Sequence, residues 1–86
     1  MNFSQALDLV KTGTTSIRRA GWNGQGQHIY LEDSLSFTIG DGVFKGQRRV
    51  YKPVLVLFNT QQEHQPGWLP SMGDLMAEDW EVAIHD

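Results

Sequence analysis

Val54-Leu55-Val56-Leu57-Phe58 is the longest strongly apolar run of this 86-residue chain. A run of this length fits one buried strand and is far too short to cross a membrane. Pro53 precedes the run and Asn59 follows it, so its ends are marked in the sequence. The run therefore predicts the central strand of a β-sheet.

Alternating apolar and polar side chains predict further strands on both sides of this run. The expected strands cover residues 14–19, 28–31, 35–39 and 80–84. Gly40-Asp41-Gly42 is a strong reversal signal, and the segment 43–52 after it predicts a hairpin excursion. Residues 60–66 have no clear period and are interpreted as a polar connection.

Two short helices are expected, one near each end of the chain. Apolar residues recur at helical spacing from Phe3 to Val10, which predicts a helix over residues 3–11. The pattern Ser71-x-x-Asp74 is typical of a capping box and predicts a second helix over residues 72–77. The expected fold class is therefore α+β, a mostly antiparallel sheet of four to six strands with a short helix near each end, in one domain over residues 1–86.

Charge is distributed unevenly along the chain, although the formal net charge is only −3. Every Lys and Arg falls between Lys11 and Lys52, and from Pro53 onward there are six acidic residues and no Lys or Arg. We expect the two signs to pair within the molecule or to face solvent. Binding of duplex DNA or RNA is not expected, because it usually requires a basic face.

Small size leaves the chain little stability in reserve. At roughly 0.05–0.15 kcal/mol per residue it has only a few kcal/mol to spare, and it contains no cysteine for a disulfide. Three Trp, four Phe and two Tyr are a large aromatic content, so we expect a homo-oligomer that covers part of this surface.

No export signal or membrane span is recognised, and a cytoplasmic location is expected.

Catalytic and metal-binding patterns are weak. Ser71 lacks the glycine that precedes a nucleophile elbow and fits a helix cap better. The three histidines are scattered without a metal-ligand spacing, and no nucleotide-binding glycine motif is complete. Asp74 and Asp79 form a possible acid and base pair, but a cap and a surface acid explain them equally well. We therefore expect no catalytic residues, no metal and no cofactor.

Binding of a flat, anionic ligand is better supported. Trp22 and Trp68 lie in glycine-flanked loops, where an indole can stack on a purine, although core packing is the alternative for each. Either Arg18 or Arg19 offers a forked donor to a pyrophosphate, and alternation along a strand allows only one to face the ligand. Trp80, at the start of a strand, is expected to belong to the core.

Two polar side chains complete this candidate ligand site. Asn23 and Asp74 are candidates for reading a base edge or a ribose hydroxyl, with an Asx turn and a helix cap as their ordinary roles. The free amides at the start of the helix expected over 72–77 favour an anionic oxygen.

A long signature runs through the chain. It comprises Asn2-Phe3-x-x-Ala6-Leu7, Gly13, Arg19-Ala20-Gly21-Trp22-Asn23-Gly24, Tyr51-x-Pro53 and Gly67-Trp68-Leu69-Pro70-Ser71-x-x-Asp74-Leu75-x-Ala77-x-Asp79-Trp80. This signature closely resembles the phage Thoeris anti-defence sponge family of the second type. The resemblance implies a small cytoplasmic protein that binds a cyclic ADP-ribose isomer, the infection signal of a bacterial Thoeris system, and sequesters it without cleavage.

The resemblance also implies a homotetramer with ligand pockets between subunits, and for some members a separate place for cyclic oligonucleotides. By motif position it assigns Trp22, Asn23, Trp68, Asp74 and Ser71 to the pocket. Two other functions stay open: an inhibitor or scaffold that binds a host protein through exposed aromatics, and a cyclic nucleotide hydrolase that uses Asp74 and Asp79.

Overall fold

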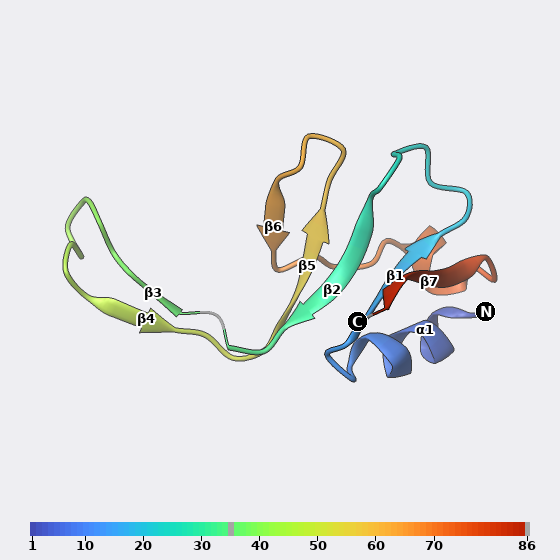
Figure 1. Ribbon diagram of the computed structural model, residues 1–86, viewed down its shortest axis with the longest axis horizontal. Coiled ribbons are helices and arrows are strands. Elements are labelled where there is room, and N and C mark those ends of the chain that lie inside the picture. The colour runs from blue at the N-terminus through green and yellow to red at the C-terminus, as the bar shows by residue number, and fades with distance from the viewer. Residues whose placement is uncertain (35, 86) are drawn as a thin grey trace.

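A computed structural model of the protein, which describes residues 1–34 and 36–85, contains a five-stranded sheet, two helices and a separate two-stranded ribbon (Figure 1). The elements are α1 (Phe3–Val10), β1 (Thr15–Arg19), β2 (His28–Glu32), β3 (Ser36–Thr38), β4 (Arg48–Val50), β5 (Val54–Phe58), β6 (His64–Pro66), α2 (Met72–Met76) and β7 (Trp80–His85). The large sheet is antiparallel in the order β6-β5-β2-β1-β7. The predicted α+β class is confirmed.

The core lies between α1 and one face of the large sheet. Ala6 and Val10 of α1 pack against Ile17 of β1, Ile29 of β2 and Trp80 of β7, and all five are buried. Ile17 and Ile29 are register partners in adjacent strands, so their side chains share this face. The apolar stripe predicted for the first helix is therefore the surface that α1 buries.

The first predicted helix, α1, begins at a capping box formed by Asn2 and Gln5. The Asn2 side chain accepts a hydrogen bond from the Gln5 amide at 2.9 Å, and the Gln5 side chain accepts one from the Asn2 amide at 2.9 Å. These bonds satisfy amides that a helix start leaves without partners. Of the helices in residues 1–34 and 36–85, none has the length and apolar content needed to cross a membrane.

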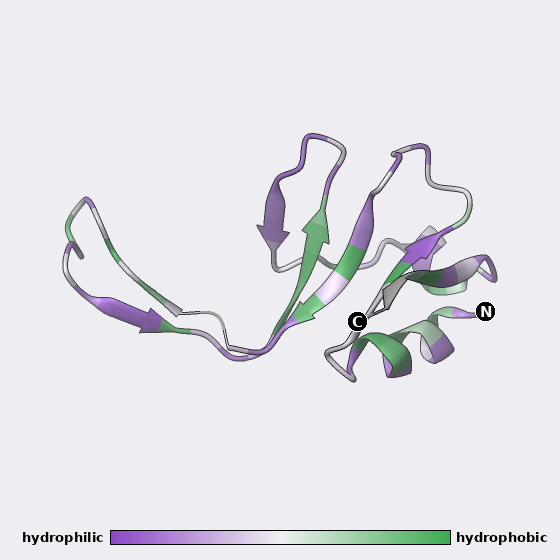
Figure 2. Cartoon of the chain, viewed as in Figure 1, coloured by the Kyte–Doolittle hydropathy of each residue, from purple (hydrophilic) through white to green (hydrophobic). Residues whose placement is uncertain are grey.

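The apolar run of β5 is a sheet strand, but the prediction that it lies at the centre is wrong. The middle strand is β2, which pairs with β5 on one side and β1 on the other. Val56 is 3% exposed, whereas the other four residues of β5 are only half-buried. Figure 2 shows the apolar colour along β5, although the strand lies next to the three-residue β6 near an edge of the sheet.

Residues 60–66 are not purely a connection, because β6 forms within them. His64 of β6 pairs with Phe58 of β5, and Phe58 pairs with His28 of β2. This register places three rings in a row across the sheet, and the Tyr30 hydroxyl lies 2.7 Å from His64 Nδ1. The strand was missed because three exposed residues are too few to show an alternating pattern.

The hairpin predicted over residues 43–52 is only the second half of the observed one, because β4 pairs with β3. The two strands form an arm, residues 36–52, that projects away from the large sheet (Figure 1). Its strands β3 and β4 pair only with each other within the described residues. Phe37 stacks on Tyr51 with ring centroids 5.6 Å apart, and the Arg49 guanidinium lies 4.8 Å from the Phe44 ring centroid. The predicted strand over 35–39 begins at Leu35, which lies outside the described residues.

Candidate functional site

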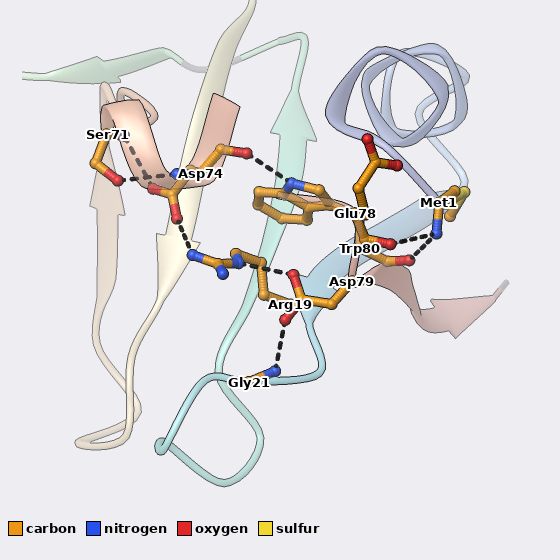
Figure 3. Close-up of polar contacts among 8 residues, drawn as sticks. All are labelled: Met1, Arg19, Gly21, Ser71, Asp74, Glu78, Asp79 and Trp80. Carbon is orange, nitrogen blue, oxygen red and sulfur yellow. Dashed lines mark hydrogen bonds and ion pairs between the residues drawn. The ribbon is translucent and has the colours of Figure 1, made fainter. Parts of the chain in front are cut away.

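Arg19, at the end of β1, joins the two halves of the signature (Figure 3). Its Nε donates to Asp79 Oδ1 at 2.9 Å and its Nη1 donates to Asp74 Oδ1 at 3.2 Å. The second oxygen of Asp79 accepts from the Gly21 amide at 3.0 Å. The half-buried guanidinium thus ties β1 and the loop after it to α2 and the start of β7. The expected pairing between the basic and acidic parts of the chain occurs here.

Asp74 is a buried residue that is hydrogen-bonded to Arg19, Ser71 and Trp80. Its Oδ2 accepts from the Ser71 amide at 2.9 Å, and the Ser71 hydroxyl accepts from the Asp74 amide at 3.1 Å. Its backbone carbonyl accepts from the indole Nε1 of Trp80 at 2.9 Å. The predicted capping box is therefore confirmed, and the same aspartate also binds Arg19 and supports the central indole of the core.

Both carboxylates that bind Arg19 are held in the ionised form. Burial alone would raise the pKa of Asp74, but hydrogen bonds from Ser71 and from Arg19 outweigh it, so the pKa lies below its ordinary value. The hydrogen bond from Arg19 lowers the pKa of Asp79, and the Gly21 amide adds to this effect. Neither carboxylate can act as a general acid near neutral pH, because each is already deprotonated.

Acid is expected to destabilise the fold through this network. Because the pKa values of Asp74 and Asp79 are lower in the folded chain than in the unfolded chain, the unfolded chain binds more protons at acid pH. The contribution is fully present above the unfolded pKa of about 3.9 and is lost as pH falls through the lower folded values. Urea unfolding midpoints measured from about pH 6 down to pH 2 should show this loss.

Arg19→Met removes the cation that lowers both pKa values, so its unfolding midpoint should be lower at neutral pH and should fall less on acidification. Lys11→Met is the matched control, because Lys11 lies just after α1 and outside the network. It should keep the wild-type acid profile. Equal acid sensitivity in wild type and Arg19→Met would contradict this assignment.

Three indoles gather beside the network. Trp80 is 2% exposed, and Trp22 and Trp68 meet it edge-on at centroid distances of 5.5 and 6.3 Å. Phe3 of α1 contacts both Trp68 and Trp80. Trp80 is a core residue, as predicted, whereas Trp22 and Trp68 are half-buried at the margin of the core and keep part of each ring exposed.

A polar cavity of about 270 Å³ opens next to Trp22. It is lined by Arg18, Arg19, Ala20, Trp22, Asn23, Gly24 and Gln25. Asn23 is exposed there, and Arg18 donates through Nε to Glu81 Oε1 at 2.8 Å. Because that bond uses Nε, the two terminal nitrogens of Arg18 are left for a ligand among the described contacts. The cavity therefore offers amide and guanidinium donors beside an indole.

The structure divides the predicted site residues into two groups. Arg18, Arg19, Trp22 and Asn23 line one cavity, whereas Ser71 and Asp74 are joined to it only through the Arg19 guanidinium. Trp68 contacts Trp80 and is not among the residues that line the cavity. Gln25 also lines the cavity and was not predicted, because a glutamine between two glycines in a loop carries no specific signal. Among the described residues, no group of three or more His, Asp or Glu side chains is placed to hold a metal ion.

Comparison with known proteins identifies relatives of the whole chain. Residues 1–83 match the Tad2-like family, described as the Thoeris anti-defense 2-like domain. Thoeris anti-defense 2 of Bacillus phage SP01 is 31% identical over 85 residues, which cover 95% of this chain and 93% of that protein. The match includes every residue named here in the network and the polar cavity.

Proposed function

The chain belongs to the Thoeris anti-defense 2-like family, and on this premise we propose that it is a phage anti-defence protein that sequesters a cyclic ADP-ribose isomer. Binding lowers the free concentration of the signal in the host cytoplasm, so the Thoeris effector stays below its activation threshold. Family membership over nearly the whole chain is the observation that carries this proposal. The geometry of the polar cavity, with the indole of Trp22 in its lining, supports it.

Recognition of the ligand uses the groups around the cavity. The exposed part of Trp22 stacks on the adenine in this cavity, and Trp68, which lies outside its lining, reaches the ligand from a neighbouring subunit. Each stacking contact is worth about 1–3 kcal/mol per base. The terminal nitrogens of Arg18 meet the pyrophosphate, since Arg19 is already bonded to two carboxylates. Asn23 reads a base edge or a ribose hydroxyl. Asp74 and Ser71 contribute indirectly: Asp74 holds the Arg19 guanidinium, and the two residues together cap the start of α2.

Sequestration without cleavage agrees with the state of the two carboxylates. A hydrolase that uses Asp74 and Asp79 needs one of them protonated as a general acid, and both have lowered pKa values. Their oxygens are also occupied by Arg19, Ser71 and Gly21. The arrangement favours a structural role for these aspartates, and we propose a binding protein and not an enzyme.

The size of the cavity favours a ligand pocket that more than one copy of the chain completes. Ligand pockets usually measure roughly 300–1,000 Å³, and the cavity beside Trp22 measures about 270 Å³. The cavity of one chain is therefore slightly smaller than a usual pocket for a ligand with a purine, two riboses and a pyrophosphate. We propose a homo-oligomer, a tetramer by analogy with the family resemblance, in which a neighbouring subunit completes the pocket. Cyclic oligonucleotides are proposed as further ligands at a separate place.

A thermal-shift panel tests the proposed ligand class. At about 100 times its Kd a ligand stabilises the native state by about 2.7 kcal/mol, which raises the midpoint of a domain this small by roughly 10–20 °C. We expect this rise with a cyclic ADP-ribose isomer and a much smaller rise with linear ADP-ribose. A protein that acts only by binding a host protein would show no rise with any nucleotide in the panel, and that outcome would contradict the proposal.

A further inference from the structure

Carboxylates outnumber guanidiniums around the polar cavity. Arg18 and Arg19 are the two cations in its lining. Arg18 binds the carboxylate of Glu81, and Arg19 binds the carboxylates of Asp74 and Asp79. Every salt bridge within residues 1–34 and 36–85 therefore belongs to this cavity. Two positive charges face three negative charges, so one negative charge is left in excess before any ligand binds.

Glu81 differs from the two aspartates because it binds the guanidinium that is left for a ligand. Arg19 uses both Nε and Nη1 for the aspartates (Figure 3), whereas Arg18 uses only Nε in the described contacts. The side chains of Arg18 and Glu81 are 45% and 41% exposed, so a phosphate can reach the guanidinium beside the carboxylate. A phosphate that binds Arg18 is therefore placed next to a second anion, the carboxylate of Glu81.

The sheet keeps this ion pair together. Arg18 of β1 and Glu81 of β7 are register partners, so their side chains leave the same face of adjacent strands. Arg18 Nε lies 2.8 Å from Glu81 Oε1. Because the sheet holds both backbones, the carboxylate stays near the guanidinium when a ligand binds there. Like charges a few ångströms apart repel each other even at a protein surface, and salt weakens this repulsion.

We propose that Glu81 is a specificity-determining residue that limits the negative charge of the ligand. The pyrophosphate of a cyclic ADP-ribose isomer carries one negative charge on each phosphate. A phosphate monoester would add about 1.5–2 further negative charges, which Arg18 cannot neutralise while it also binds Glu81. The carboxylate therefore disfavours nucleotides that end in a phosphate monoester or a triphosphate. This inference rests on the proposed function, because it concerns the ligand of the same cavity.

Glu81→Gln removes the charge of this side chain and keeps its shape. The amide oxygen of glutamine can still accept a hydrogen bond from Arg18 Nε, so the guanidinium keeps its orientation. Glu78→Gln is the matched control, because Glu78 is exposed and does not bind Arg18, and the change of net charge is the same. Circular dichroism should show a native fold for both variants, since exposed ion pairs contribute little to stability.

Calorimetry with two ligands at two salt concentrations measures the effect, with displacement titration for the weaker ligand. The ligands are a cyclic ADP-ribose isomer and its derivative with a phosphate monoester on one ribose hydroxyl. At about 50 mM salt, the wild type should bind the derivative roughly tenfold more weakly. Glu81→Gln should lower the Kd of the isomer roughly threefold and the Kd of the derivative roughly tenfold. At about 1 M salt, where the Debye length is about 3 Å, these gains should largely disappear.

Three results would overturn the charge limit. Weaker binding of both ligands by Glu81→Gln would mean that the carboxylate orients Arg18 and does not restrict the ligand. An equal gain in Glu78→Gln would reduce the effect to the net charge of the chain. A ratio of the two Kd values that Glu81→Gln leaves unchanged would show that charge does not distinguish the ligands.

The wild type separates this inference from the proposed function. A wild-type chain that binds neither ligand contradicts the proposed function, and the charge limit falls with it. A wild-type chain that binds the isomer while Glu81→Gln gives one of the three results above refutes the charge limit alone.

Discussion

Trp80→Ala is expected to abolish cooperative folding. Trp80 is 2% exposed, contacts the rings of Phe3, Trp22 and Trp68, and donates to the Asp74 carbonyl. Replacing a buried Trp by Ala costs about 3–5 kcal/mol. A chain of this size has only a few kcal/mol in reserve at roughly 0.05–0.15 kcal/mol per residue. The substitution should therefore remove the thermal transition seen by circular dichroism.

Trp80→Phe separates the ring from its hydrogen bond. It keeps an aromatic ring in the core and loses the bond from the indole Nε1 to the Asp74 carbonyl, a bond worth about 0.5–1.5 kcal/mol. We expect this variant to fold with a lower midpoint. If Trp80→Ala melted cooperatively within a few degrees of the wild type, Trp80 would not be the centre of the core.

Trp22→Leu and Trp68→Leu are each expected to weaken nucleotide binding strongly. Stacking contributes about 1–3 kcal/mol per base, which corresponds to roughly a 5- to 150-fold rise in Kd. Both rings are half-buried, so leucine retains part of their packing against Trp80. We expect calorimetry below the unfolding midpoint of each variant to show the weaker binding while circular dichroism shows a native fold.

Phe58→Leu is the matched control for these indoles. Phe58 is also a half-buried ring, but it packs between His28 and His64 in the row across β2, β5 and β6, outside the indole cluster. The variant should bind nucleotide like the wild type, with a modestly lower midpoint. Wild-type affinity in both Trp→Leu variants would exclude the indoles from the ligand site.

Sequence patterns that involve only neighbouring residues correctly predicted the helices and several strands and turns. The Ser71-x-x-Asp74 pattern predicted the cap of α2, and the apolar spacing from Phe3 to Val10 predicted α1. The alternation that indicated β1 and the glycines that indicated the arm turn are local as well. Each of these features depends on contacts within a few residues, so the sequence contains all of the relevant information.

Strand order could not be predicted in the same way, because it depends on distant pairing. Hydrophobicity made Val54–Phe58 a candidate for the centre, but β2 takes that place by pairing with both β1 and β5. A strand such as β6, with three exposed residues, exists because β5 offers an unpaired edge.

Side-chain contacts in the candidate site were also hard to predict where they join residues that are distant in the sequence. The sequence offered a helix cap and a ligand contact as roles of Ser71 and Asp74, and the structure shows the cap. It did not predict that Arg19 would bind Asp74. Asp79, which is 60 residues from Arg19 in the sequence, accepts a hydrogen bond from the Nε of Arg19. No local pattern reports such a pair. The uneven distribution of charge along the chain was the one available indication that distant residues of opposite sign would meet.

Incubation of the protein with a cyclic ADP-ribose isomer, followed by ultrafiltration and chromatography of both fractions, tests the central claim most directly. We expect the free nucleotide to fall in proportion to the added protein, and heat denaturation to return it intact. The final amount should equal the amount supplied. A free concentration that does not change, or recovery of ADP-ribose in place of the cyclic isomer, would contradict sequestration without cleavage.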